Sequence, residues 1–329
     1  MNFPDEFFQD EYRCDFLVPE LMKRAWAAEM EILEIVDYIC QKYNLQYFAD
    51  YGTLLGAVRH QGFIPWDDDI DITLKRNDYN ILISVLPKEL PKGFVIDGLH
   101  APDTTLRLHT NIAHTSVKTD PSYWSLPDHI SRFHGFPFRG TFIDIFPLDY
   151  IPRDPNTFSL EKNVLTYIFL LLRDFDTLSE DTREAHLIKL ESLTAVKLPR
   201  NETTKWSLFC LLEAFSSMFD KGECDELDFC FRIPYEDKKP LKKEWYDETI
   251  RLPFEGFQIS APKHYHEILT AYYEDYKTPV KFTQAHDYPF YQRGEQELTD
   301  ILAQQGFHGS ICDFVRNIDS FHIIDSNIK

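Results

Sequence analysis

Long apolar runs are absent from this sequence of 329 residues. The longest, YIFLLL at residues 167–172, is far shorter than the ~20 residues of a membrane-spanning helix. The start, MNFPDEFFQDEYRC, also lacks the basic segment and apolar segment of a secretory signal. We therefore expect a cytoplasmic protein without a transmembrane segment, with peripheral attachment at the inner face of the membrane as the alternative.

Paired cysteines are missing too. The six cysteines are scattered without CxxC spacing: Cys14, Cys40, Cys210, Cys224, Cys230 and Cys312. This spacing argues against a zinc knuckle and against a disulfide framework, and it favours a reducing compartment.

Positive charge is scarce, because 34 lysines and arginines face 54 aspartates and glutamates, a net charge of −20. Such an acidic chain has no general attraction to nucleic acid or to anionic membranes. Hydrophobic residues make up 43% and aromatic residues 15% of the chain, which is typical of a folded globular protein.

Periodicity predicts the main elements. Apolar residues at steps of four and three predict a long amphipathic helix at 18–43 that packs over the core. Expected strands are 45–52, ending at Gly52, then 67–74, 93–97 and 142–152, with a strand or hairpin at 106–117. Expected helices are 53–62, with Gly62 as C′ residue, 77–86, capped by Asn77, then 157–174, 182–196, 204–218 and one after a proline at 262. Residues 121–138 are expected to form a binding loop.

The most informative stretch is YGTLLGAVRHQGFIPWDDDIDITL at 51–74. On an extended chain Asp69 and Asp71 project from the same side, about 6.6 Å apart. Their oxygens suit Mg²⁺ or Mn²⁺, which would also remove the repulsion between the acids. Asp67 shares this face but lies nearest the loop, whereas Asp68 points away. The alternative is a solvated acidic turn.

Residues before the aspartates suit a phosphate. Gly52 and Thr53 lie at a strand-to-helix junction, where glycine lets a phosphate approach the backbone N–H groups. Arg59 suits a phosphate clamp, with a structural ion pair as the alternative. Trp66 is expected either to stack on a nucleobase or wall the pocket, or to pack in the core.

This pairing of a Gly-Thr cradle with a D-x-D strand resembles the nucleotidyltransferase superfamily. The full string YGTLLGAVRHQGFIPWDDDIDI resembles the LicD family of phosphocholine transferases, related to the fukutin group. Two later blocks support the resemblance: FIDIFPLDYIP at 142–152 and PFEGFQISAPKHYHEILTAYYEDY at 253–276.

The resemblance implies an α+β fold with a nucleotidyltransferase-like mixed sheet, flanking helices and a helical C-terminal elaboration. The corresponding regions are an N-terminal helical segment at 1–44, a catalytic core at 45–155, a helical region at 156–276 and a tail at 277–329. It also implies transfer of a substituted phosphate from a CDP-linked donor to a glycan hydroxyl, with release of CMP.

Asp69 and Asp71 match the family's metal-binding pair. We expect Asp144 to be the third carboxylate, because FIDIF alternates and places one acid among apolar residues. It would bind metal or accept the acceptor's proton. Asp149, beyond a proline, is the alternative and is expected to be a turn or cap residue, and His60 is given no firm role.

The donor's pendant group stays open. Choline, a quaternary cation, would favour an aromatic cage, for which candidates are Tyr123, Trp124, Phe133, Phe136 and Phe138. Ribitol or glycerol would need hydroxyl partners. The resemblance suggests teichoic acid, lipopolysaccharide or capsule precursors as acceptors. Rival functions are a nucleotide-sugar glycosyltransferase that uses D-x-D and a metal, and a catalytically inactive binding module of the same fold.

Overall fold

The computed structural model describes residues 1–99, 107–113, 134–138, 142–230, 240–280 and 288–317. Its central sheet runs in the order β3 (Tyr47–Ala49), β4 (Ile70–Lys75), β7 (Phe142–Pro152), β6 (Thr110–Ala113) and β5 (Val95–Asp97). The far half of β7 also pairs with β8 (Cys224–Asp228), which pairs with β9 (Leu241–Lys242). Among the strands of the described ranges, only β4 and β7 pair in parallel. The predicted α+β fold class is confirmed.

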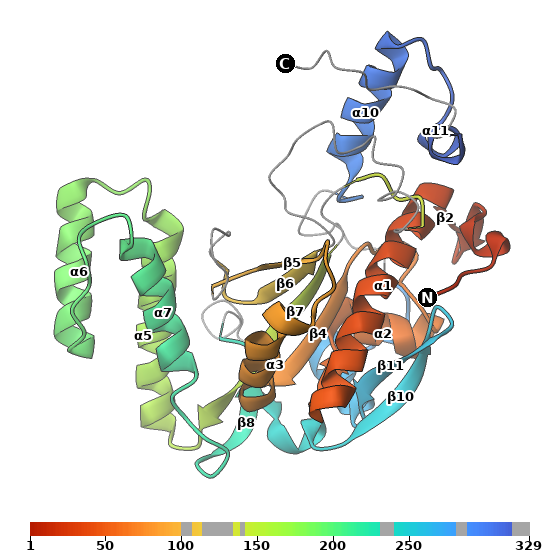
Figure 1. Ribbon diagram of the computed structural model, residues 1–329. Coiled ribbons are helices and arrows are strands. Elements are labelled where there is room, and N and C mark those ends of the chain that lie inside the picture. Colours follow the sequence, from red (N-terminus) through yellow and green to blue (C-terminus); the bar gives the residue numbers. More distant parts are fainter. Residues whose placement is uncertain (100–106, 114–133, 139–141, 231–239, 281–287, 318–329) are drawn as a thin grey trace.

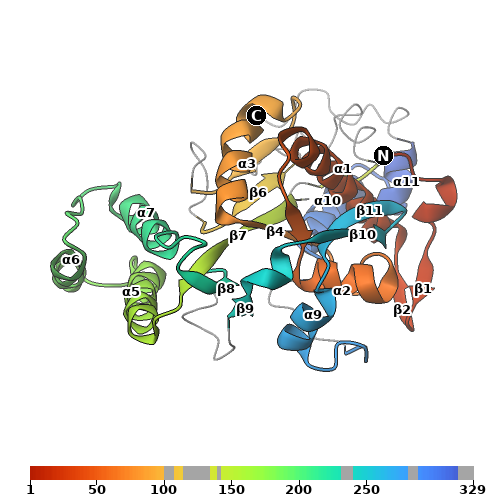
Figure 2. The same cartoon turned by 90° about the horizontal axis from the view of Figure 1, so that it is seen from below.

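Helices lie on both faces of this sheet (Figures 1 and 2). One face carries α1 (Glu20–Tyr43) and α3 (Arg76–Glu89), and the other carries α2 (Tyr51–His60) and α9 (Tyr265–Tyr273). The strands alternate accordingly, because Ile70 and Ile72 of β4 and Ile143 of β7 are fully buried on the α1 side. Asp71 and Asp144 alternate with these isoleucines along their strands, so their side chains point to the opposite face.

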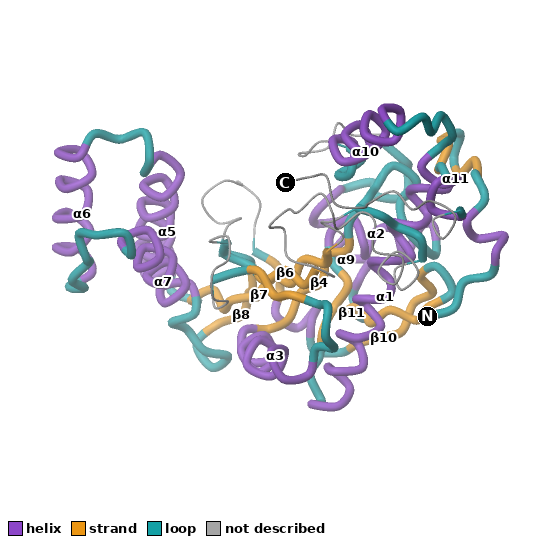
Figure 3. The backbone as a smooth tube through the Cα atoms, turned by 45° about the horizontal axis from the view of Figure 1, so that its top comes forward, coloured by secondary structure: helices purple, strands orange, loops and turns teal. Residues whose placement is uncertain are grey.

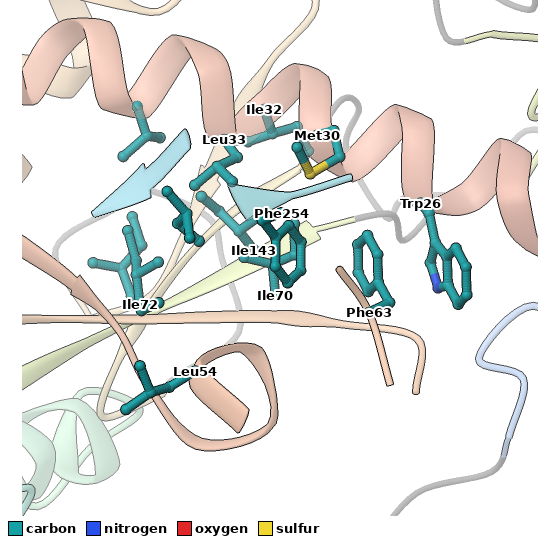
Figure 4. Close-up of a cluster of buried hydrophobic side chains, with 14 of the residues drawn as sticks. Trp26, Met30, Ile32, Leu33, Leu54, Phe63, Ile70, Ile72, Ile143 and Phe254 are labelled. Carbon is teal, nitrogen blue, oxygen red and sulfur yellow. The ribbon is translucent and has the colours of Figure 1, made fainter. Parts of the chain in front are cut away.

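The predicted N-terminal helix is present and packs on the core. Its apolar stripe includes Trp26, Met30 and Leu33, all fully buried (Figure 4). The Trp26 ring stacks on Phe63, with centroids 4.6 Å apart and an interplanar angle of 2°. This contact fixes α1 over the loop that leads into β4.

Two short β-hairpins lie near α1 and α2. They are β1 (Glu11–Arg13) with β2 (Phe16–Val18), and β10 (Thr249–Phe254) with β11 (Phe257–Pro262). Short 3-10 turns precede β1, at η1 (Asp5–Phe8), and β10, at η3 (Lys243–Tyr246). Glu255, at the β10–β11 turn, accepts a hydrogen bond from the backbone N–H of Phe63 and pairs with Arg13. Glu255 therefore ties the β10–β11 turn to β1 and to the loop after α2.

Three helices form an arm on one side of the sheet (Figures 1 and 3). They are α5 (Pro155–Asp174), α6 (Glu180–Thr194) and α7 (Thr204–Ser216), and they agree with the predicted helices. They bury an apolar cluster of their own, whereas α10 (Gln292–Gln304) and α11 (Ile311–Arg316) add residues to the main cluster. Among the described residues, none of the helices is both long and apolar enough for a membrane span.

Several predicted boundaries were wrong. Strand β3 ends at Ala49, so Gly52 lies inside the first turn of α2 rather than at a strand end. The left-handed residue that ends α2 is Gln61 (φ 55°), not Gly62. A proline was expected to start the helix at α9, but Pro262 ends β11.

Two further differences concern the aspartates and the loops. Strand β4 begins at Ile70, so Asp69 precedes the strand rather than lying within it. Helix α3 begins at Arg76 with Lys75 as its N-cap, so Asn77 is not the cap. Of the expected binding loop, residues 121–133 lie outside the described residues.

Candidate active site

The carboxylates singled out in the sequence meet where β4 and β7 run side by side. Asp71 is the register partner of Asp144, so both side chains lie on one face, one strand spacing of about 4.8 Å apart. Asp69 immediately precedes the strand, and its charge acts on Asp71 and Asp67. The structure therefore brings the four predicted acids together, and their roles in metal binding and catalysis stay predictions.

Burial and mutual repulsion both act on the acids of this cluster. Burial raises the pKa of Asp71 well above its ordinary value, and the charges of Asp69, Asp144 and Asp67 raise it further. Burial also raises the pKa of Asp67, and the charges of Asp69 and Asp68 raise it further. A divalent cation bound here would offset a cost that the fold otherwise carries.

Sequence analysis missed one acid of this cluster, Glu29 on α1. Its side chain is 1% exposed, and Oε2 has no hydrogen-bond partner. Burial raises its pKa well above the ordinary value, and the aspartates, with Asp69 first, add to this. Trp26, one turn earlier, donates a hydrogen bond from Nε1 to the carbonyl oxygen of Asp67 at 3.0 Å. Because Glu29 lies on the same buried stripe as Trp26, its position on a helical wheel was the available signal.

The start of α2 is tied to the aspartates. Thr53 Oγ1 accepts a hydrogen bond from the backbone N–H of Asp71 at 2.8 Å, and Asp50 caps the helix by accepting from the N–H of Tyr51. A Cβ atom on Gly52 would lie 2.5 Å from Asp67 Oδ2, so a side chain there would displace that carboxylate. Gly52 and Thr53 thus hold the N-terminus of α2 against the acids, where the sequence placed a phosphate.

A pocket of about 530 Å³ opens beside Gly52 and Asp67. Its lining comes from α2, the loop before β4, and α9 with the residues after it: Gly52, Leu55, Arg59, Ile64, Trp66, Asp67, Tyr272, Tyr273, Glu274, Asp275, Tyr276, Thr278 and Val280. Arg59 donates hydrogen bonds to the carbonyl oxygen of Tyr276 (3.2 Å) and to His60 Nε2 (2.8 Å). Burial and the adjacent Arg59 lower the pKa of His60 to about 4, so its ring is neutral and accepts this bond.

Aromatic residues form much of the pocket wall. Trp66 is 9% exposed and lines the pocket, so it combines the buried position and the wall position that the sequence left as alternatives. Tyr272 stacks on Tyr51, with centroids 5.3 Å apart and an interplanar angle of 11°. Tyr272 and Tyr273 were not among the site residues predicted from the sequence, so their place in the pocket was missed.

The aromatic residues proposed from the sequence lie elsewhere. Phe136 and Phe138 are buried in the core, where both contact Tyr291. Tyr123, Trp124 and Phe133 lie outside the described residues. Phe136 and Phe138 are therefore core residues and not part of the pocket.

Asp149, the alternative third carboxylate, has a structural partner. It lies within β7 rather than in a turn, and Arg76 donates to both of its oxygens, at 2.6 and 2.7 Å. Asp144 Oδ1, in contrast, has no hydrogen-bond partner. This difference favours Asp144 as the acid that contacts a ligand.

The donor atoms of the cluster fit a hard divalent cation. Within the described ranges, no three acidic, histidine or cysteine side chains are already gathered as a metal cage. Mg²⁺, however, commonly takes one or two carboxylates and completes its coordination with substrate phosphates and water. The partly buried acids Asp67 and Asp71, and Asp144 Oδ1, which has no hydrogen-bond partner, supply such oxygens.

Comparisons with known proteins agree with this geometry. Residues 44–160 match the family model described as LicD/FKTN/FKRP, nucleotidyltransferase domain. Residues 44–160 are therefore similar to a LicD-type nucleotidyltransferase domain, and the predicted resemblance is confirmed. The matched range includes β3, α2, β4, β6 and β7, which hold the aspartates.

Among individual proteins, the chain is similar to the lipopolysaccharide cholinephosphotransferase LicD of Haemophilus influenzae. The two are 28% identical over 266 residues, which cover 78% of this chain and 92% of the relative. Shorter matches join it to two uncharacterized proteins, RP689 of Rickettsia prowazekii (39% over 66 residues, 20% of this chain and 25% of the relative) and RT0683 of Rickettsia typhi (36% over 94 residues, 27% and 30%). The family and the first relative support the predicted phosphotransferase type of enzyme.

Proposed function

We propose that this protein transfers phosphocholine from CDP-choline to a hydroxyl of a cell-surface glycan or its lipid-linked precursor, with release of CMP. The observation that carries the proposal is the pocket beside Gly52 and Asp67, which joins an arginine, a helix N-terminus and aromatic walls to the aspartate cluster. The similarity to a lipopolysaccharide cholinephosphotransferase supports choline phosphate as the transferred group.

Different residues act on the phosphates of the donor and on the hydroxyl of the acceptor. Arg59 and the N–H groups at the start of α2 bind donor phosphate oxygens. Asp69 and Asp71 would hold Mg²⁺ or Mn²⁺, which would neutralise charge on the leaving CMP. Asp144, the register partner of Asp71, accepts the proton of the attacking hydroxyl. The hydroxyl oxygen bonds to the phosphorus of phosphocholine while the bond to the bridging oxygen breaks.

The pocket suits a trimethylammonium group better than a polyol. The aromatic residues Trp66, Tyr272 and Tyr273 line it, together with the acids Glu274 and Asp275. Aromatic faces attract quaternary ammonium groups by cation–π interaction. All six cysteines are free thiols, which favours a reducing compartment, so we place the reaction at the cytoplasmic face of the membrane.

The test is release of CMP from CDP-choline, CDP-ribitol and CDP-glycerol, with and without glycans, in Mg²⁺ or in EDTA. We expect CDP-choline to be preferred and EDTA to stop the reaction. Tyr273→Ala should lower the preference for choline about tenfold, the size of a cation–π contact, whereas Tyr265→Ala, on the same helix but outside the pocket, should leave it unchanged. Faster release from CDP-ribitol, or turnover of uridine diphosphate sugars alone, would contradict the proposal.

A further inference from the structure

A row of polar side chains continues the aspartate cluster across the sheet. Asp71 of β4 pairs in register with Asp144 of β7, Asp144 with Asn111 of β6, and Asn111 with Asp97 of β5. Register partners on neighbouring strands project from the same face. At about 4.8 Å per strand, the row extends about 14 Å from Asp71. A sheet face with four polar residues level with one another is unlike the apolar face beneath α1.

Asn111 is the informative member of this row. Its side chain is 3% exposed, and neither Oδ1 nor Nδ2 has a hydrogen-bond partner. Leaving a buried polar group unpaired costs about 1–3 kcal/mol, and buried side chains of this kind nearly always have partners. A carboxamide with both its donor and its acceptor unused fits a ligand group that both donates and accepts, as a hydroxyl does.

Two basic side chains accompany the row. His109 Nε2 lies 3.4 Å from Asp144 Oδ1, and Arg107 Nε lies 3.3 Å from Asp97 Oδ2. The side chains of His109 and Asp144 keep 19% and 16% of their surface exposed. The row is therefore reachable at Asp144, and Asn111 lies one strand further along.

The position of the row separates it from the donor pocket. Helix α2, which lines that pocket, comes directly after β3 in the chain, and β3 borders β4 on one side. Strands β7, β6 and β5 lie on the other side of β4. A transferase of the proposed kind needs donor and acceptor on opposite sides of the reacting phosphorus, because the attacking and leaving oxygens lie roughly in line.

We propose that Asn111 and Asp97 bind hydroxyl groups of the acceptor sugar and so place its attacking hydroxyl beside Asp144. This inference deepens the proposed function and rests on it for the identity of the ligand. Asn111 acts as a specificity residue for the acceptor and has no part in binding the donor.

The first test is binding of methyl hexosides, measured by saturation-transfer NMR without donor or metal, so that it does not depend on catalysis. We expect a signal from at least one methyl hexoside with the wild type. The signal should fall at least tenfold in Asn111→Leu, which keeps the size of the side chain, and in Asn111→Asp, which removes the donor. Thr73→Val is the matched control, because Thr73 is fully buried with an unpartnered Oγ1 on the same face of β4. It should bind as the wild type does.

The second test is the melting temperature of the same variants without ligands. Asn111→Leu should melt no lower than the wild type, because it removes two unpaired polar atoms. A lower melting temperature would show that Asn111 supports the fold, and unchanged hexoside binding in both Asn111 variants would show that it binds no sugar. Either result overturns the inference, as does the absence of hexoside binding by the wild type. Failure of CDP-choline to release CMP would instead overturn the proposed function. CMP release and hexoside binding are measured in separate experiments, so the two failures can be distinguished.

Discussion

Asp144 and Asp149 lie five residues apart on the same strand, yet their surroundings differ. Asp149 is 1% exposed, and Nε and Nη2 of Arg76 donate hydrogen bonds to its two oxygens. Arg76 also pairs with Glu213 on α7 at 2.9 Å. Asp144 has an unpartnered oxygen and an acid, Asp71, as its register neighbour. Arg76 donates to both oxygens of Asp149, whereas Asp144 Oδ1 has the imidazole of His109 at 3.4 Å and no hydrogen bond, which leaves it available to a ligand.

This contrast separates acids that maintain the fold from acids that are kept for chemistry. The buried pair of Arg76 and Asp149 joins α3 to β7, and Arg76 reaches the helical arm through Glu213. Loss of the pair should therefore be felt in stability. Acids that repel one another in the free protein destabilise it, so their loss should be felt in activity and not in stability.

The largest expected effect is that of Asp71→Asn on activity. We expect kcat for transfer to fall by about 10³-fold or more, the scale of losing a central electrostatic contact, while the melting temperature of the metal-free protein stays equal or rises. The measurements are CMP release and thermal unfolding. Activity within tenfold of the wild type would place Asp71 outside the site.

Asp149→Ala should give the opposite pattern, a loss of about 3–5 kcal/mol in the free energy of unfolding, because Arg76 would keep its charge in a buried position without its main partner. Urea denaturation measures this directly. If the variant unfolds with less than about 1 kcal/mol lost, the ion pair between α3 and β7 does not stabilise the fold.

The sequence predicted those parts of the fold and site that depend on local pattern. The helix at α1, the strand at β7 and the three helices of the arm were predicted because their periodicity is strong. The aspartates and the Gly52-Thr53 turn were found because they form one continuous motif.

What the sequence could not show depends on contacts between distant segments. Pairing of β4 with β7, and of β7 with β6, sets Asn111 level with Asp144, and no local pattern encodes that register. Glu29 was hidden for a similar reason, since an acid on a helix is usually solvated and only the packing of α1 over the loop at Asp67 buries it. The residues on α9 that line the pocket looked like ordinary packing residues.

Arg59→Ala tests the donor side of the same comparison. Removing a charged hydrogen bond to phosphate costs about 1.5–3 kcal/mol, so KM for CDP-choline should rise about 10- to 100-fold. Arg153→Ala is the control, because Arg153 forms an exposed pair with Asp225 far from the aspartates. An equal effect of both variants on KM would remove Arg59 from the donor site.

The smallest effect concerns Glu161 on α5, a buried acid outside the site with both oxygens unpartnered. Burial, and then the charge of Asp149, raises its pKa from 4.5 to about 8. The folded state therefore holds this proton in a range where the unfolded chain has lost it, and stability should fall as the pH rises from 4.5 to 8.

Glu161→Gln should remove that pH dependence. We expect the variant to be more stable than the wild type by at least about 1 kcal/mol at pH 8.5, the value of about one pKa unit, and equally stable at pH 4.5. Denaturation curves at both pH values measure it. Parallel pH profiles of the two proteins would show that the carboxyl of Glu161 ionises normally.

The most direct measurement of the central claim is a titration with Mn²⁺, followed by electron paramagnetic resonance, in the presence of CDP-choline. The wild type and Glu161→Gln should bind the ion with equal affinity, while Asp69→Asn and Asp71→Asn should bind it at least tenfold more weakly. Binding of Mn²⁺ to all four proteins with the same affinity would contradict the account.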